Sequence, residues 1–253
     1  MRIAICISGF LRTYRYCFKQ LFDNVLYDKK NQYDFFIHTW DSLGFSKGWC
    51  FDIDFSDSLD LEHVKSVYNP KKIVVENLNN VKLPELRKNA VVKQGLDPSR
   101  SISMFRKIYE CNELKKQFEK ENGFLYDFVV RTRGDLRFYD NVKEKQDVVF
   151  EGMSTKLVLK KEYDIAFSEE NLNFLHVSHS NYDLVGDVFP EMINDSFGYG
   201  SSGIIDRYSE IFLNFNTLTK MGVLYHPETL LKAHIEFNKI QIKKHKFMVE
   251  ILR

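Results

Sequence analysis

Cysteine is scarce in this sequence, and the four that occur are widely spaced: Cys6, Cys17, Cys50 and Cys111. Zinc sites and the disulfide frameworks of small secreted domains need cysteines at short, repeated spacings. Two of the four lie within apolar helix or strand patterns, which favours buried, reduced thiols. We therefore expect neither a disulfide nor a zinc site, and a cytoplasmic protein.

Net charge and long apolar runs are also lacking. The 36 basic and 35 acidic residues leave a formal charge of +1, which argues against broad, sequence-independent binding to nucleic acid. No segment approaches the roughly 18 consecutive apolar residues of a membrane-spanning helix. The apolar run at residues 3–7 is too short for a signal peptide, because polar residues soon interrupt it. Contact with a polyanion or a membrane is therefore expected to be local.

Internal repeats, the G-x-G-x-x-G dinucleotide fingerprint and the G-x-S-x-G motif of serine hydrolases are missing as well. The 253 residues instead alternate strand and helix patterns, at a length that suits one α/β domain. Such alternation predicts a mostly parallel central sheet flanked by helices. The expected strands are residues 3–7, 33–41, 71–76 and 128–130, and the expected helices are 14–25, 60–68 and 101–122.

The remaining segments are less regular. Residues 77–98 lack periodicity and are expected to form a loop or lid beside the sheet. For the second half we expect a smaller region of mixed strands, followed by a charged edge strand at 239–253. As an alternative, the segment 239–253 contacts an anionic membrane. Its expected elements are strands near 156–159, 165–167 and 174–177 and helices at 182–193, 202–221 and 227–238.

Charged and polar side chains gather where the predicted strands end. The strand at 128–130 runs directly into Arg131, Arg133 and Asp135, with Arg137 beyond them. Because ligands bind at the carboxyl ends of strands in open α/β sheets, this cluster suggests an anionic ligand, with a salt-bridged surface turn as the alternative. Two other strand ends would meet it along one edge of the sheet: Ser8, Gly9 and Arg12, and His38, Trp40 and Asp41.

With these residues in place, the chain resembles the GT-A type glycosyltransferases, specifically the small bacterial and large-virus enzymes of capsule, lipopolysaccharide or surface-glycan assembly. The resemblance spans nearly the whole chain in family order. It implies a Rossmann-like nucleotide-sugar-binding half at residues 1–140 and an acceptor-side half at 141–253 within one domain. The matching stretches are residues 5–13, 34–41, 103–108, 126–136, 195–202 with 206–209, and 227–231.

The resemblance implies a nucleotide-sugar donor, a glycan or lipid-linked glycan acceptor, and a divalent cation, Mn²⁺ or Mg²⁺. Asp135 occupies the slot of the family's Asp-x-Asp motif, but Gly134 precedes it and Arg137 replaces the second acid. Either a hydrated Mg²⁺ needs only this one carboxylate, or the arginines neutralise the leaving group directly. The implied donor-binding residues are Ser8, Gly9, Arg12, His38, Asp41, Met104, Arg131 and Asp135, with Arg133 stabilising the leaving group.

Asp195 precedes a predicted glycine-spaced turn at 197–200, where it resembles the acid with which inverting GT-A enzymes deprotonate the acceptor; a turn or helix-capping role is the alternative. His226 resembles a histidine that some relatives add to the metal shell, or it caps the helix at 227–238. His176 and His179 are discounted as a metal pair, because their segment reads as strand and loop. Two further functions stay open: a sugar nucleotidyltransferase, and a non-catalytic nucleotide- or glycan-binding relative.

Overall fold

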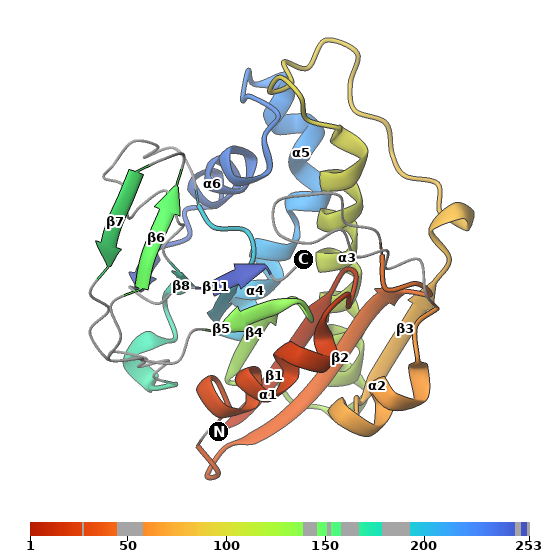
Figure 1. Cartoon of the computed structure of the whole chain (residues 1–253), viewed down its shortest axis with the longest axis vertical. Coiled ribbons are helices and arrows are strands. Elements are labelled where there is room, and N and C mark those ends of the chain that lie inside the picture. The colour runs from red at the N-terminus through yellow and green to blue at the C-terminus, as the bar shows by residue number, and fades with distance from the viewer. Residues whose placement is uncertain are drawn as a thin grey trace.

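A seven-stranded sheet in the order β10-β8-β9-β4-β1-β2-β3 forms the centre of the computed structural model (Figure 1). The structure describes residues 1–26, 28–44, 58–138, 146–150, 153–157, 167–178, 193–245 and 249–251. The strands of this sheet are β1 (Arg2–Ser8), β2 (Gln32–Trp40), β3 (Lys72–Glu76), β4 (Phe128–Thr132), β8 (Leu175–Ser178), β9 (Gly198–Gly200) and β10 (Ile242–His245).

Four neighbouring strands, β4, β1, β2 and β3, run parallel, and β10 also runs parallel to β8. Only β9 is antiparallel to its two neighbours within this sheet. The predicted mostly parallel sheet flanked by helices is therefore confirmed. Two small antiparallel pairs stand beside it: β5 (Leu136–Phe138) with β11 (Val249–Ile251), and β6 (Gln146–Phe150) with β7 (Met153–Leu157).

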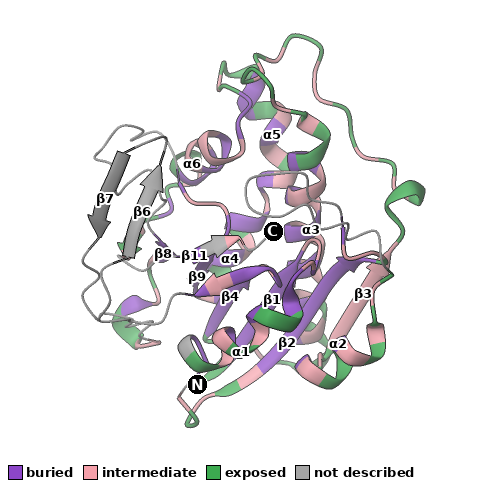
Figure 2. Cartoon of the chain, in the orientation of Figure 1, coloured by how far each residue is buried: buried purple, intermediate pink, exposed green. Residues whose placement is uncertain are grey.

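Helices cover both faces of the sheet because the central strands are apolar on both sides. Ile3, Ile5 and Ile7 pack with α1 and α2, whereas Ala4 and Cys6 pack with α3 and the C-terminal helices. Figure 2 shows the central strands buried between these layers and β3 less covered at the sheet edge. The helices are α1 (Tyr14–Asn24), α2 (Leu61–Tyr68), α3 (Pro98–Asn122), α4 (Ser202–Ser209), α5 (Ile211–Lys220) and α6 (Pro227–Phe237).

The long helix α3 begins three residues before the expected start. Asp97 caps it by accepting a hydrogen bond from the Ser99 N–H, and Pro98 takes the first helical position, where a missing N–H costs nothing. Gly123 ends the helix in the left-handed conformation (φ +68°). The Asp-Pro pair, which we had assigned to the preceding loop, is thus the start signal of α3.

Two predictions for the second half are wrong. The single helix expected at 202–221 is broken at Glu210, whose ψ of 0° departs from the helical value and separates α4 from α5. The glycine-spaced stretch after Asp195 is not a turn but strand β9. A Cβ on Gly200 would lie 2.9 Å from Ile204 Cγ2, so this glycine allows α4 to pack closely on the strand.

Residues 77–97 contain one 3₁₀ turn, η1 (Leu78–Asn80), and otherwise lack regular helices and strands, as predicted for 77–98 except at Pro98. They run from β3 to the top of Figure 1 beside α5. The segment is tied down: the Arg87 N–H donates to Asn216 Oδ1 (3.1 Å), and Val92 forms a bridge with Tyr225. The segment is therefore a strap held against α5 and α6.

Several predictions lie wholly or partly outside the described residues: Cys50, His179, most of the helix at 182–193, and parts of the strands at 156–159 and 165–167. The other three cysteines, Cys6, Cys17 and Cys111, are buried free thiols, as expected. Among the described helices, none combines the length and apolar character that a bilayer crossing requires.

Candidate functional site

The connections of the chain reverse direction between β1 and β4. From β1 the chain moves outward to β2 and β3, then returns along α3 to β4 on the other side of β1. In open α/β sheets such a reversal leaves space at the carboxyl ends of the two strands, where ligands bind. Ser8 ends β1, and Arg131 and Thr132 end β4, so the predicted strand-end residues do share one edge of the sheet.

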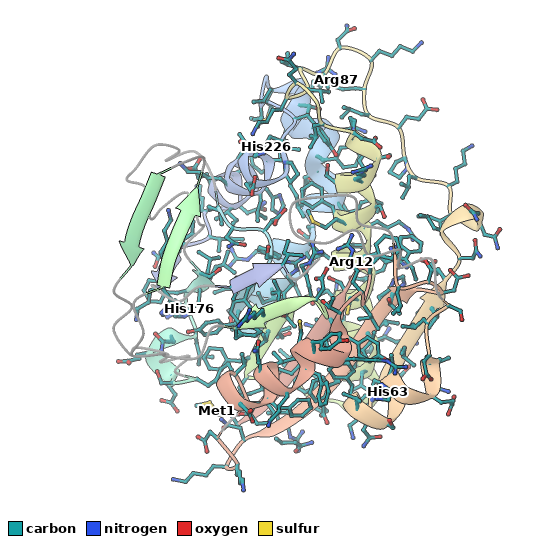
Figure 3. All side chains as sticks on the ribbon, viewed as in Figure 1. Met1, Arg12, His63, Arg87, His176 and His226 are labelled. Atoms are coloured by element: carbon teal, nitrogen blue, oxygen red, sulfur yellow. The ribbon has the colours of Figure 1, made fainter. Side chains whose placement is uncertain are left out.

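The loop after β1 is fastened to the end of β2. The Gly9 N–H donates to the His38 carbonyl (3.1 Å), and the Thr39 hydroxyl donates to the Gly9 carbonyl (2.9 Å). Gly9 has a φ of +96°, which a side chain would strain. This turn carries Arg12 toward the end of β4, and Figure 3 shows Arg12 just beyond the tip of β1.

Asp135 is fully buried between two guanidinium groups. Arg133 Nε and Nη2 donate to its two oxygens at 2.7 and 2.9 Å, and Arg12 Nη1 donates to Oδ2 at 2.7 Å. Burial alone would raise the pKa of Asp135, but Arg133 and Arg12 outweigh it and lower the pKa to about 2. Gly134 permits this turn, because a Cβ there would lie 2.6 Å from Leu11 Cδ2.

This arrangement does not fit a divalent cation at Asp135. Both carboxylate oxygens already accept N–H groups, and the neighbouring side chains are cations. No cluster of three or more His, Cys, Asp or Glu side chains suited to a metal occurs among the described residues. His226 contacts Lys93 Nζ (3.3 Å), which is again a cation. Metal binding by Asp135 and His226 stays a prediction.

Three of the predicted donor-binding residues form a row across β4, β1 and β2. Arg131 lies opposite Cys6 and His38 lies opposite Ser8, so all three side chains point to the face that α3 covers. Within the described part of the chain, Arg131 Nε and Nη2, Ser8 Oγ and His38 Nδ1 are buried and have no hydrogen-bond partner. Unpaired buried polar groups are costly, so we expect partners from outside the described residues to satisfy them.

Arg131 is 1% exposed, and its single hydrogen bond runs from Nη1 to the Asp195 carbonyl oxygen. The antiparallel pairing of β9 with β4 explains this contact, because the residues just before β9 lie next to the end of β4. Asp195, predicted on the acceptor side, is thereby tied directly to the arginine cluster. Burial lowers the pKa of Arg131, and no carboxylate among the described residues forms an ion pair with it.

A second charged cluster lies beside this row, at the ends of β2 and β3. Glu76 accepts two hydrogen bonds from Arg106 (2.7 and 2.9 Å) and one from Lys107 (2.8 Å). Lys107 is fully buried, donates to the Thr39 carbonyl (2.8 Å) and lies 3.5 Å from the centre of the Trp40 ring. This cluster was not predicted: Arg106 and Lys107 lie in the matching stretch 103–108, but within an ordinary helical pattern that gives them no role.

This second cluster sets the protonation of its members. Hydrogen bonds from Arg106 lower the pKa of Glu76 to about 2, whereas burial lowers the pKa of Lys107 to about 8. Burial and the Lys107 charge lower the pKa of His38 to about 3, so His38 is neutral at pH 7. Asp41 lies further along the same edge, exposed, and accepts a hydrogen bond from Asn77 Nδ2 (2.7 Å).

Met104, the remaining predicted donor-binding residue, is partly buried in the first half of α3 and packs against the larger core cluster. Because α3 returns the chain to β4, its N-terminal end lies at the carboxyl ends of the strands.

A groove of about 940 Å³ opens near the other end of α3, lined in part by Gln117, Lys120 and Gly123. It does not include any of the predicted site residues.

Asp195 is partly exposed, and its carboxylate has one weak contact, 3.4 Å from the Ser196 hydroxyl. The turn role weighed for Asp195 belongs to Asn194, whose Oδ1 accepts the Ser196 N–H (2.8 Å). The charge of Asp195 nevertheless acts on Glu228, at the start of α6. Burial and Asp195 together raise the pKa of Glu228 to about 7. Glu228 was not among the predicted site residues.

His226 takes the capping position of α6, but its ring makes no capping bond to the helix backbone. Its Nε2 lies 3.0 Å from Glu228 Oε2 and 3.3 Å from Lys93 Nζ, which the strap supplies. Figure 3 shows His226 at the start of α6, above the sheet. Lys93 reaches it because its N–H donates to the Tyr225 carbonyl (3.2 Å).

No protein-family model matches this chain, and no curated protein matches its sequence.

Proposed function

We propose that the protein is a glycosyltransferase of the GT-A type that binds a nucleotide-sugar donor at the carboxyl ends of β1 and β4. The supporting observation is the buried Arg131 guanidinium, two of whose nitrogens have no partner among the described residues, beside two further arginines held in fixed positions. A buried, unpaired cation is strongly unfavourable. The phosphate groups of a donor would accept directly from the partly exposed Arg12 and Arg133, and from the buried Arg131 nitrogens only after a local opening, since guanidinium and phosphate geometries match.

The reaction requires opposite help at the two ends of the transferred sugar. The acceptor oxygen forms a bond to the anomeric carbon while the bond from that carbon to the donor phosphate breaks, and the electron pair leaves with the phosphate. Arg131 and Arg133 stabilise the leaving charge. The proton of the acceptor hydroxyl passes to a carboxylate, the predicted role of Asp195.

The acceptor would be a surface glycan, free or lipid-linked, and we expect a cytoplasmic enzyme whose contact with the inner face of a membrane is at most peripheral. A non-catalytic relative that binds the donor without turnover is the second candidate, because both oxygens of the single acid in the Asp-x-Asp slot are already occupied. A sugar nucleotidyltransferase would instead release pyrophosphate from a sugar phosphate and a nucleoside triphosphate.

A thermal-shift screen against UDP-, GDP-, CMP- and dTDP-sugars, with and without Mn²⁺, tests the proposal. A donor at a hundred times its Kd stabilises the folded state by about 2.7 kcal/mol, which raises the melting temperature by roughly 5–10 °C in a chain of this size. Asp195→Asn should keep this shift but lower nucleotide release by about 10²-fold or more. A chain that no nucleotide sugar stabilises is not such an enzyme, and binding without release would identify the second candidate.

A further inference from the structure

The side chains at the ends of β1 and β4 together carry the charge of a divalent cation. Arg12, Arg131 and Arg133 contribute three positive charges, and the buried carboxylate of Asp135 removes one. These four side chains sum to +2, the charge that Mg²⁺ or Mn²⁺ would bring to a diphosphate. The carboxylate of Asp195 acts on Arg131 and Arg133 as well, from a partly exposed position outside this group. No other acid forms an ion pair with these arginines among the described residues.

The order of the charges decides what a ligand meets first. The carboxylate of Asp135 has no exposed surface, whereas the Arg12 and Arg133 side chains are 13% and 12% exposed. An anion that approaches this edge therefore contacts guanidinium groups and not the acid. The salt bridges from Asp135 hold these two arginines in place, so little side-chain entropy remains to be lost when a phosphate binds.

We infer that the protein binds the phosphates of its donor without a divalent cation, that Arg12, Arg131 and Arg133 take the cation's place, and that Asp135 is a positioning residue. The inference rests on the proposed function and concerns the same site. It assigns Asp135 a role different from that of an acid in an Asp-x-Asp motif, because the carboxylate acts on the ligand only through the arginines.

A metal at Asp135 would have to disrupt this arrangement. At least one of the three N–H contacts to the carboxylate would break, and the incoming cation would lie next to the guanidinium groups released. Like charges at such distances repel strongly where water is largely excluded. A diphosphate meets no comparable obstacle at Arg12 and Arg133, since the partly exposed side chains of these two arginines can donate to its oxygens.

Calorimetric titration of the metal-stripped protein with inorganic pyrophosphate and with UDP, in EDTA and in Mn²⁺, tests the inference. We expect binding in EDTA, and Kd values that differ by less than about threefold between the two buffers. Arg133→Met should weaken binding in EDTA at least tenfold and Arg133→Lys by less, because lysine keeps the charge without the two-pronged contact. Arg207→Met, which removes an exposed arginine of α4, is the matched control for net charge and should change little.

Asp135→Asn separates the two roles of the acid. If Asp135 anchors the arginines, the substitution should weaken binding in EDTA at least tenfold. If Asp135 is a metal ligand, the substitution would leave that binding intact and abolish a Mn²⁺-dependent gain. If the asparagine variant does not fold, Arg12→Lys combined with Arg133→Lys gives the same comparison. Binding only in Mn²⁺ would overturn the inference and leave the proposed function standing. Failure of pyrophosphate, UDP and every nucleotide sugar to bind in either buffer would overturn both.

Discussion

Two charged clusters lie side by side at the same edge of the sheet and differ in how completely their hydrogen bonds are satisfied. Around Glu76, the buried Lys107 has a carboxylate, a backbone carbonyl and an aromatic face as partners. Around Arg131, two nitrogens of a buried guanidinium have no partner in the described part of the chain. Both clusters place charge at a strand end. The unsatisfied donors around Arg131 are what distinguish the proposed binding site from the structural salt bridges around Glu76.

The largest effect on stability is expected in the Glu76 cluster, where the buried Lys107 has a full set of partners. Glu76→Gln leaves the Lys107 ammonium buried without its counter-ion, and the free energy of unfolding should fall by about 3 kcal/mol, measured by urea denaturation. The partial exposure of Glu76 keeps the figure at the low end of the range for buried pairs.

Glu62→Gln is the matched control for that change, because Glu62 pairs with Lys65 on the surface of α2 and should cost less than about 0.5 kcal/mol. Adding Lys107→Met to Glu76→Gln should recover much of the loss, since the orphaned charge is then gone. A Glu76→Gln protein as stable as the original would mean that Lys107 does not depend on its salt bridge.

Acid should affect His38 and Asp135 in different pH ranges. His38 has a folded-state pKa of about 3, below its ordinary value of about 6.5, so the unfolded chain takes up a proton that the folded chain refuses. Stability is therefore lost from about pH 6.5 downward, by at most about 1.4 kcal/mol per pH unit. Asp135, with a pKa of about 2, contributes roughly 2 to 3 kcal/mol that is lost only between about pH 4 and pH 2.

Unfolding curves at pH 7, 5.5, 4.5 and 3 measure both contributions. His38→Gln should flatten the decline between pH 6.5 and 4.5, and Asp135→Asn should flatten it only below pH 4. Other buried histidines, His176 and His234, add to the first decline and are common to both proteins. An unchanged slope in His38→Gln would show that this histidine is not held neutral by its surroundings.

The sequence predicted the edge of the sheet and allowed for a local salt bridge such as that of Arg133 with Asp135, but it did not predict the charge pairs between distant residues, and the reason is physical. Strand ends follow from local apolar runs, so Ser8, His38 and Arg131 could be assigned to one edge before any coordinates were known. Salt bridges depend on side chains far apart in the chain: Lys107 meets Glu76 across 31 residues, and Arg12 meets Asp135 across 123. No local sequence pattern predicts a contact between residues so far apart in the chain.

The same distinction explains other differences. The apolar spacing of 202–221 continues through Glu210, so a break set by one backbone angle leaves no trace in the pattern. The start of α3 did leave a trace, because Asp-Pro is a normal capping pair, but it is also a normal loop pair. Lys93 is brought to His226 by the strap, whose path depends on tertiary contacts alone.

The smallest change in stability should come from the Arg131 site, where partners are missing, and the change should be a gain where that of Glu76→Gln is a loss. Arg131→Met removes a buried charge that only one backbone carbonyl satisfies, so the free energy of unfolding without ligand should stay the same or rise by up to about 1 kcal/mol. The Asp195 carbonyl that it releases lies in a partly exposed turn, where water can replace the guanidinium. The stabilisation by a saturating nucleotide sugar should disappear in the same variant. Urea denaturation with and without the ligand measures both terms, and a loss above about 2 kcal/mol without ligand would place Arg131 with Lys107 as a structural charge.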